Sequence, residues 1–190
     1  MSLVEWPIHT ERLVLRPYED ADLDQLWAFE QLPEVQRWLG WAPHSRDELA
    51  EHLPSEGTIQ VMVLLADRVI GHILIMRRNS WAQADVADRA VNLEAELGWM
   101  FDPAMGGRGY ATEAVRAAVT VCFEGLGLRR VHAGCFADNT ASWRLMERIG
   151  MRREEHSRLT ALHRDGTWHD GMNYGLLREE WPPASGGATA

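Results

Sequence analysis

The sequence predicts a single layered α/β (α+β) domain with a mixed central sheet of about seven strands and helices on both faces. Two apolar runs in the first half, separated by two charged residues, are typical of a β-hairpin. In the second half, strand-like and helix-like segments alternate, as they do where helices connect parallel strands. A length of 190 residues with 46% hydrophobic and 25% charged residues suits one globular domain. We expect this domain to cover residues 1–183, and residues 184–190 to form a small, polar, disordered tail.

Alternating apolar residues, or short apolar runs bounded by Pro, Gly or polar residues, predict the strands. In chain order they are residues 8–16, 59–66, 69–76, 91–101, 130–136, 152–160 and 172–177. Pro17 ends the first strand, and Asp67-Arg68 is expected to form the turn between the second and the third.

Apolar residues at helical spacing, together with capping residues, predict the helices. These are residues 20–30, 109–123 and 139–150, and the polar residues 79–89 are expected to form a loop. Asp20 and Asn139 are suitable N-caps, and Gly125 and Gly150 are suitable C-terminal stops.

Composition argues against several classes of function. The formal net charge of -9 opposes nonspecific nucleic-acid binding, which depends on clustered Lys and Arg. No apolar run reaches the ~18 residues of a membrane-spanning helix, and the N-terminus does not resemble a signal peptide, so we expect no membrane partner and a cytoplasmic location. Cys122 and Cys135 lack the spacing of a disulfide framework and are expected to be reduced. We expect no metal, and His163, His169 and Asp170 are interpreted as a polar hairpin.

A glycine-rich turn stands between a predicted strand and the most regular predicted helix. Gly106, Gly107 and Gly109 lack the side-chain atoms that would keep an anion away from the backbone, and the N-terminus of the next helix attracts negative charge. A nucleoside-triphosphate loop is excluded because no Lys follows these glycines. A dinucleotide fingerprint is disfavoured because Thr112 stands in place of its third glycine. The turn is predicted to bind a phosphate, with a turn that has no ligand as the alternative.

The segment around this turn, GWMFDPAMGGRGYATEAV, resembles the coenzyme A motif Q/R-x-x-G-x-G/A of the GNAT superfamily of N-acyltransferases. Gly109 and Ala111 match the motif, whereas Gly106 replaces the expected Gln or Arg. The segments TERLVLRP, DNTASWRLMERIGM and RDGTWHDGMNYGLLREEW are similar to the Rim-type branch, which acetylates the N-termini of ribosomal proteins. The four segments occur in the order found in that branch and extend the resemblance over roughly residues 10 to 181.

The resemblance implies an acetyl-coenzyme A dependent N-acetyltransferase, in which a primary amine attacks the thioester directly. Residues 91–101 and 130–136, the fourth and fifth strands, are then expected to splay into a V that holds the pantetheine arm. The resemblance does not decide whether the acceptor is a protein N-terminus or a small amine. A longer acyl donor than acetyl-coenzyme A and a homodimer are both compatible with it. A non-catalytic acyl-coenzyme A sensor or scaffold is the alternative function. The residues expected to bind the coenzyme are Trp99, Met100, Phe101, Gly106, Gly107, Arg108, Gly109, Tyr110, Ala111, Thr112, Asn139 and Ser142.

Two residues are expected to carry the chemistry. Glu96, in the strand that leads to the glycine turn, is expected to act as general base, and Ser142 to give a proton to the departing thiolate. Glu94 is expected to bind the positive charge of the substrate, and Trp38 and Trp41 to line the acceptor cleft. The alternatives are that Glu96 is a buried structural carboxylate and that Ser142 belongs only to a helix cap.

Overall fold

The computed structural model describes residues 4–53 and 57–181. The tail expected at residues 184–190, and the domain boundary expected at residue 183, lie outside these ranges. No helix within the described residues is long and apolar enough to cross a membrane.

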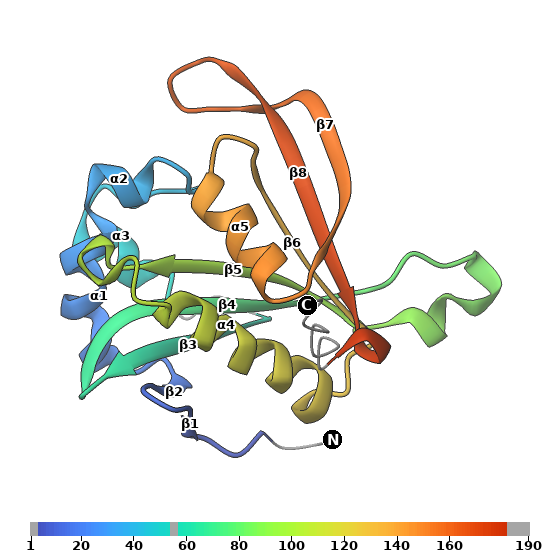
Figure 1. Cartoon of the computed structure of the whole chain (residues 1–190), viewed down its shortest axis with the longest axis horizontal. Coiled ribbons are helices and arrows are strands. Elements are labelled where there is room, and N and C mark those ends of the chain that lie inside the picture. Colours follow the sequence, from blue (N-terminus) through green and yellow to red (C-terminus); the bar gives the residue numbers. More distant parts are fainter. Residues whose placement is uncertain (1–3, 54–56, 182–190) are drawn as a thin grey trace, which may run out of the picture.

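The centre of the molecule is one mixed sheet of eight strands in the order β1-β2-β3-β4-β5-β6-β8-β7 (Figure 1). The strand expected at residues 8–16 is two short strands, because the chain turns at Thr10, whose N–H donates to the Leu13 carbonyl. This turn accounts for the difference between the seven strands expected and the eight found. The strands are β1 (Ile8–His9), β2 (Val14–Pro17), β3 (Thr58–Leu65), β4 (Arg68–Arg78), β5 (Glu94–Phe101), β6 (Arg130–Phe136), β7 (Arg152–Leu162) and β8 (Trp168–Leu177).

Helices cover both faces of the sheet, as the sequence predicts. Alternate residues of β3 enter two separate hydrophobic clusters, with Val61 and Val63 in one and Met62 and Leu64 in the other. The first cluster also holds the apolar faces of α4 (Tyr110–Thr120) and α5 (Thr140–Arg148). The second holds those of α1 (Leu23–Glu30) and α3 (Arg46–Glu51). The remaining helical segments are η1 (Asp20–Asp22), α2 (Pro33–Gln36), η2 (Ala84–Ala90), η3 (Pro103–Met105), η4 (Val121–Gly125) and η5 (Arg178–Glu180).

The hairpin of β3 and β4 differs from the prediction by one residue. Leu65 pairs with Arg68, so Ala66 and Asp67 form the turn, and the expected turn residue Arg68 belongs to the ladder. Both turn residues have positive φ, 48° and 65°, as in the two-residue turns whose twist matches that of the flanking strands. The loop expected at residues 79–89 contains the short helix η2, and β5 begins at Glu94 rather than at residue 91.

β5 and β6 form the V expected between the fourth and fifth predicted strands. They pair in parallel over three positions, Glu94 with Arg130, Ala95 with Val131 and Glu96 with His132. Beyond these pairs β5 continues beside β4, and β6 continues beside β8 (Figure 1). The strand edges that face each other across the open part of the V therefore lack a β partner.

An ion-pair cluster fastens the closed end of the V. The carboxylate of Glu94 accepts hydrogen bonds from Ser80, Arg129 and Arg130, at 2.7, 2.7 and 2.9 Å. Arg130 also binds the carboxylate of Glu154, so the cluster joins β5, β6 and β7. Burial by itself would raise the pKa of Glu94, but the hydrogen bonds from Ser80 and Arg130 and the two arginine charges hold this pKa below its usual value.

The substitution Glu94→Gln should destabilise the domain, because it removes the charge that Arg129 and Arg130 surround. Hydrogen bonds to charged groups contribute about 1.5 to 3 kcal/mol each, so we expect a loss of about 1 to 3 kcal/mol in the free energy of unfolding at neutral pH. The pKa of Glu94 is lower in the folded protein than in the unfolded chain. Its carboxylate therefore contributes to the free energy of unfolding above the unfolded pKa of about 4.3, and this contribution is lost as the pH falls through the folded pKa. Urea unfolding of both proteins should therefore show a stability difference that narrows at acid pH. A difference that does not depend on pH would contradict the ionic origin of the effect.

Candidate active site

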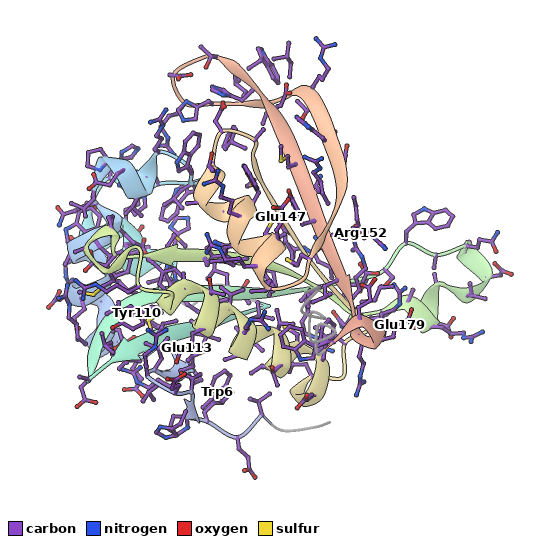
Figure 2. The ribbon with its side chains drawn as sticks, in the orientation of Figure 1. Trp6, Tyr110, Glu113, Glu147, Arg152 and Glu179 are labelled. Carbon is purple, nitrogen blue, oxygen red and sulfur yellow. The ribbon has the colours of Figure 1, made fainter. Side chains whose placement is uncertain are left out.

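A cleft of about 1220 Å³ opens where β5 and β6 diverge. Leu97 to Phe101 of β5 line it on one side, and Gly134 and Cys135 of β6 on the other. The glycine turn and the first turn of α4 close one end, and residues of α1 and α2 line the opposite end. Figure 2 labels Tyr110 and Glu113 on the first part of α4, where the glycine-turn end of the cleft lies. Ligand pockets usually measure about 300 to 1,000 Å³, so this cleft has room for an extended ligand and a second molecule.

The backbone of the glycine turn forms an open cradle that could hold an anion. Gly107 and Gly109 have positive φ, 74° and 81°, a conformation that favours glycine, and Gly109 is the N-cap of α4. A Cβ atom at Gly107 would meet no atom within 4 Å, so the backbone here lies open to a ligand. The first N–H groups of a helix have no partner within the helix, and those of α4 follow directly on this turn. Gly106, Tyr110, Ala111 and Thr112 also line the cleft at this end.

Arginines that the sequence analysis did not single out supply the positive charge at the cradle. Arg12, Arg116 and Arg148 line the cleft, whereas Arg108, the arginine expected there, does not. The guanidinium of Arg12 donates to the carbonyl of Arg108 at 2.9 Å and pairs with Glu113 at 2.6 Å. These residues come from distant parts of the chain, so no local pattern marks them as one group.

Glu113 lines the same end of the cleft, but its charge is already compensated. Burial would raise the pKa of its carboxyl, yet hydrogen bonds from Thr10 and Arg12 hold this pKa below its usual value. Glu113 thus fixes the position of Arg12, and it does not leave an unpaired negative charge beside the phosphate cradle.

The middle of the cleft contains the residues expected near the thioester. Trp99, Met100 and Phe101 line it from β5, and Asn139 and Ser142 line it from the start of α5. The side-chain oxygen of Asn139 accepts the backbone N–H of Ser142 at 3.3 Å, so Asn139 is the N-cap of α5 as predicted. Cys135 lies across from β5, and burial raises the pKa of its thiol to about 11, so it is protonated at neutral pH.

The two tryptophans expected in the acceptor region are both in the cleft. Trp38 packs between Phe136 and His163, with ring centroids 5.8 and 5.7 Å away. Trp41 stacks on His52 at a centroid distance of 4.0 Å and is 42% exposed. The carboxylates that line this end are Glu30 and Glu34, rather than the two glutamates expected from the sequence.

Glu94 and Glu96 do not line the cleft, contrary to the roles expected for them. Glu94 lies in the ion-pair cluster at the closed end of the V, and Glu96 binds Arg78 at 2.9 Å with 40% of its side chain exposed. The physical reason is their position along β5: both stand on the part that pairs with β6, and the cleft opens only beyond it. Glu96 is therefore a partly exposed carboxylate paired with Arg78, rather than the buried structural group that was its alternative, and its expected role as base stays a prediction.

A buried polar group at the acceptor end was missed by the sequence analysis. It consists of Glu30 of α1, Gln60 of β3 and His72 of β4, each less than 5% exposed. A signal for it exists in the sequence, because Glu30 stands on the apolar stripe of α1 and His72 interrupts an apolar strand. Polar residues at core positions of this kind are uncommon without a partner or a function.

The histidines near the β7–β8 turn form a compact polar network outside the cleft. Ligand atoms of His163, Asp165 and His169 all lie within 4.8 Å of one another, which is the one group with metal-ligand spacing among residues 4–53 and 57–181. His163 contacts the Arg37 carbonyl at 2.9 Å and Asp165 at 2.9 Å, and His169 contacts Asp138 at 2.5 Å. The carboxylate that joins His163 and His169 in this network is Asp165. Asp170, which was expected in the group, binds His156 instead.

Comparison with known proteins agrees with this architecture. The family model described as acetyltransferase (GNAT) domain matches residues 12–152. The uncharacterized N-acetyltransferase YnaD of Bacillus subtilis (strain 168) is 27% identical over 179 residues, which cover 92% of this chain and 98% of that protein. The crystal structure of a GNAT-family acetyltransferase from Bacillus anthracis superposes with a TM-score of 0.75 and 26% identity, covering 92% of this chain and 100% of that one.

A structure of Mycobacterium smegmatis RimJ in complex with CoA-disulfide is similar with a TM-score of 0.74 and 19% identity, covering 90% of this chain and 84% of that one. At that level of identity the likeness concerns the fold. The family model covers most of the described residues, including the glycine turn and the strands of the V. The chain therefore belongs to the GNAT acetyltransferase family and is an N-acetyltransferase.

Proposed function

We propose that this protein transfers the acetyl group of acetyl-coenzyme A to a primary amine, which attacks the thioester directly. The observation that carries the proposal is the continuity of the cleft, which runs from a cationic glycine cradle through the open V to an acidic, aromatic end. Each part matches one chemical requirement: phosphates, a thioester arm and a positively charged acceptor. A protein N-terminal α-amine is the first acceptor to test, because its pKa of ~7.7 to 8.0 leaves roughly a tenth to a sixth of it neutral at pH 7, far more than for a lysine side chain.

The residues that line the cleft fit coenzyme A. Backbone N–H groups at Gly107, Gly109 and Tyr110 would hold the diphosphate, and Arg12 and Arg148 would add charge. The unpaired strand edges of the V offer N–H and C=O groups to the amides of the pantetheine arm. Trp99, Met100 and Phe101 would then lie beside the thioester, where a backbone N–H of β5 can stabilise the oxyanion.

Acylation of several amines, with release of the free thiol of coenzyme A as the readout, tests the activity. We expect thiol release from acetyl-coenzyme A to accelerate with N-terminal peptides or with polyamine, aminoglycoside or amino-acid amines, and to stay at the hydrolytic rate without them. Acetyl-coenzyme A can be compared with longer acyl donors in the same assay. If the protein binds coenzyme A but no amine accelerates thiol release, it is an acyl-coenzyme A sensor or scaffold and the proposed activity is wrong.

The substitution Gly109→Glu should weaken coenzyme A binding, because it places bulk and negative charge in the phosphate cradle. Gly127→Glu is a matched control, since Gly127 also has positive φ, 69°, but lies past the other end of α4. A hydrogen bond to a charged group is worth about 1.5 to 3 kcal/mol, so losing one or two should reduce the affinity by about tenfold to ten-thousandfold. Calorimetric titration with coenzyme A measures this, and equal affinities for the two variants would place the diphosphate elsewhere.

Ser142 is proposed to give a proton to the departing thiolate. The substitution Ser142→Ala should lower kcat about 10- to 100-fold and leave coenzyme A affinity nearly unchanged, because general acid catalysis commonly contributes 10² or more. Thr140→Ala is the control, since Thr140 is exposed on the same first turn of α5 but does not line the cleft. Equal turnover of the two variants would reduce Ser142 to a member of the helix cap.

A further inference from the structure

One wall of the acceptor end of the cleft is a single face of α2 and of the turn that follows it. The residues of this segment that line the cleft are Glu34, Val35, Trp38 and Leu39. They stand at positions i, i+1, i+4 and i+5, which lie on the same side of a helix. Arg37, the C-cap of α2, still has helical φ and ψ, so the helical spacing continues past the last residue of α2. We call this face the acceptor wall.

The β7–β8 turn holds the acceptor wall in place. Nε2 of His163 donates to the carbonyl of Arg37 at 2.9 Å, and the guanidinium of Arg164 donates to the carbonyl of Leu39 at 2.7 Å. The ring of Trp38 packs on the ring of His163, with centroids 5.7 Å apart. Carbonyls at the end of a helix have no partner within it, so these side chains satisfy groups that would otherwise need water. A wall that is fixed in this way loses little freedom when a ligand binds to it.

Glu34 is the carboxylate of the acceptor wall, and it is accessible. The residue is exposed and lines the cleft. Across residues 4–53 and 57–181, no hydrogen bond or ion pair engages its carboxylate. Glu30 stands at the same end but is buried, with its Oε1 2.8 Å from Nε2 of His72. Glu34 is therefore the carboxylate at this end whose oxygens can reach a ligand.

Aromatic rings stand at the same end as Glu34. Trp38 follows Glu34 by one helical turn, and side chains at this spacing are neighbours, with Cβ atoms about 5 to 6 Å apart. Trp41 is 42% exposed, and its ring stacks on His52 at a centroid distance of 4.0 Å. Aromatic rings attract ammonium and guanidinium groups over their faces. A free carboxylate beside such rings favours an organic cation as its ligand.

The cation that suits Glu34 is not the amine that reacts. An amine attacks the thioester in its neutral form, whereas a basic group held beside a carboxylate is favoured in its protonated form. The thioester is expected beside Trp99 and Met100 in the middle of the cleft, and Glu34 stands at the end of the cleft. An acceptor therefore uses Glu34 only if it has a second basic group.

We propose that the acceptor carries a second cationic group, an ammonium or a guanidinium, and that Glu34 binds this group and so determines the specificity of the enzyme. This inference rests on the proposed function. A diamine and a peptide N-terminus that is followed by a basic residue both have this chemistry. Because Glu34 binds the acceptor without touching the reacting atoms, its removal should raise KM and leave kcat nearly unchanged.

The test uses two matched pairs of acceptors, diaminobutane against butylamine, and a short peptide with Lys against the same peptide with Gln after its N-terminal residue. We expect the unsubstituted protein to prefer the dicationic member of at least one pair, and that pair identifies the source of the second charge. Glu34→Gln should lower kcat/KM for this member by about 3- to 30-fold, and for the other member by less than about twofold. Glu51→Gln is the control, since Glu51 is exposed on α3 but does not line the cleft.

A reversal of charge and a change of salt give independent measurements. Glu34→Lys should disfavour the dicationic acceptor more strongly than Glu34→Gln does, because it replaces an attraction by a repulsion. Added salt should reduce the preference of the unsubstituted protein, since salt screens an accessible ion pair, and it should have little effect on the preference of Glu34→Gln.

Three results would overturn the proposal: an active protein that prefers neither dicationic acceptor, a preference that persists in Glu34→Gln, or an equal loss in Glu51→Gln. Titration with coenzyme A reports the folding of each variant. If Glu34→Gln does not fold, Glu34→Lys gives the same comparison, and if neither folds Glu34 is structural and the proposal fails. An unsubstituted protein that acetylates no amine would refute the proposed function itself, which separates the two failures.

Discussion

β5 and β6 pair over three residues and then diverge, and the arrangement of the cleft depends on this divergence. Each strand keeps a partner on its outer side, β4 for β5 and β8 for β6, so the sheet stays intact while two inner edges become free. Free backbone N–H and C=O groups are costly unless something bonds to them, and an amide-containing ligand can do so. The same divergence sets α4 and α5 at the open end, where their N-termini meet the cleft, while the Glu94 cluster closes the other end.

Charge is divided along the cleft in spite of the net charge of -9. Arg12, Arg116 and Arg148 line the end at the glycine turn, where Glu113 pairs with Arg12, and Glu30 and Glu34 line the opposite end; Glu11 also lines the cleft. Inside a cleft with low-dielectric walls such charges act over a longer range than on an open surface. An anionic coenzyme would therefore favour the end with the arginines, and a cationic amine would favour the end with the glutamates. The atoms that react would then meet in the middle, beside β5.

Local features of the sequence predict the parts of the site that lie within one segment. The glycine turn, α4 and the Asn139 cap need only neighbouring residues, and the structure has them where they were expected. Contacts between distant segments were not predictable in this way: Arg12 reaches the glycine turn from the other end of the chain, and Glu30 meets His72 only through tertiary packing. The position of Glu96 outside the cleft was not predictable, because periodicity indicates only the face of a strand on which a residue lies. Whether that face is open to the cleft depends on how far β5 pairs with β6.

The carboxylates of this protein differ in the number of hydrogen bonds that they accept. Glu94 and Glu113 each accept bonds from several donors, which hold their pKa values low, and such carboxylates fix structure because they have little capacity left for a substrate. Glu30 is more deeply buried, and its Oε1 lies 2.8 Å from Nε2 of His72. Glu94 fixes structure in this way at the closed end of the V, and Glu113 does so beside the glycine turn, where it holds Arg12.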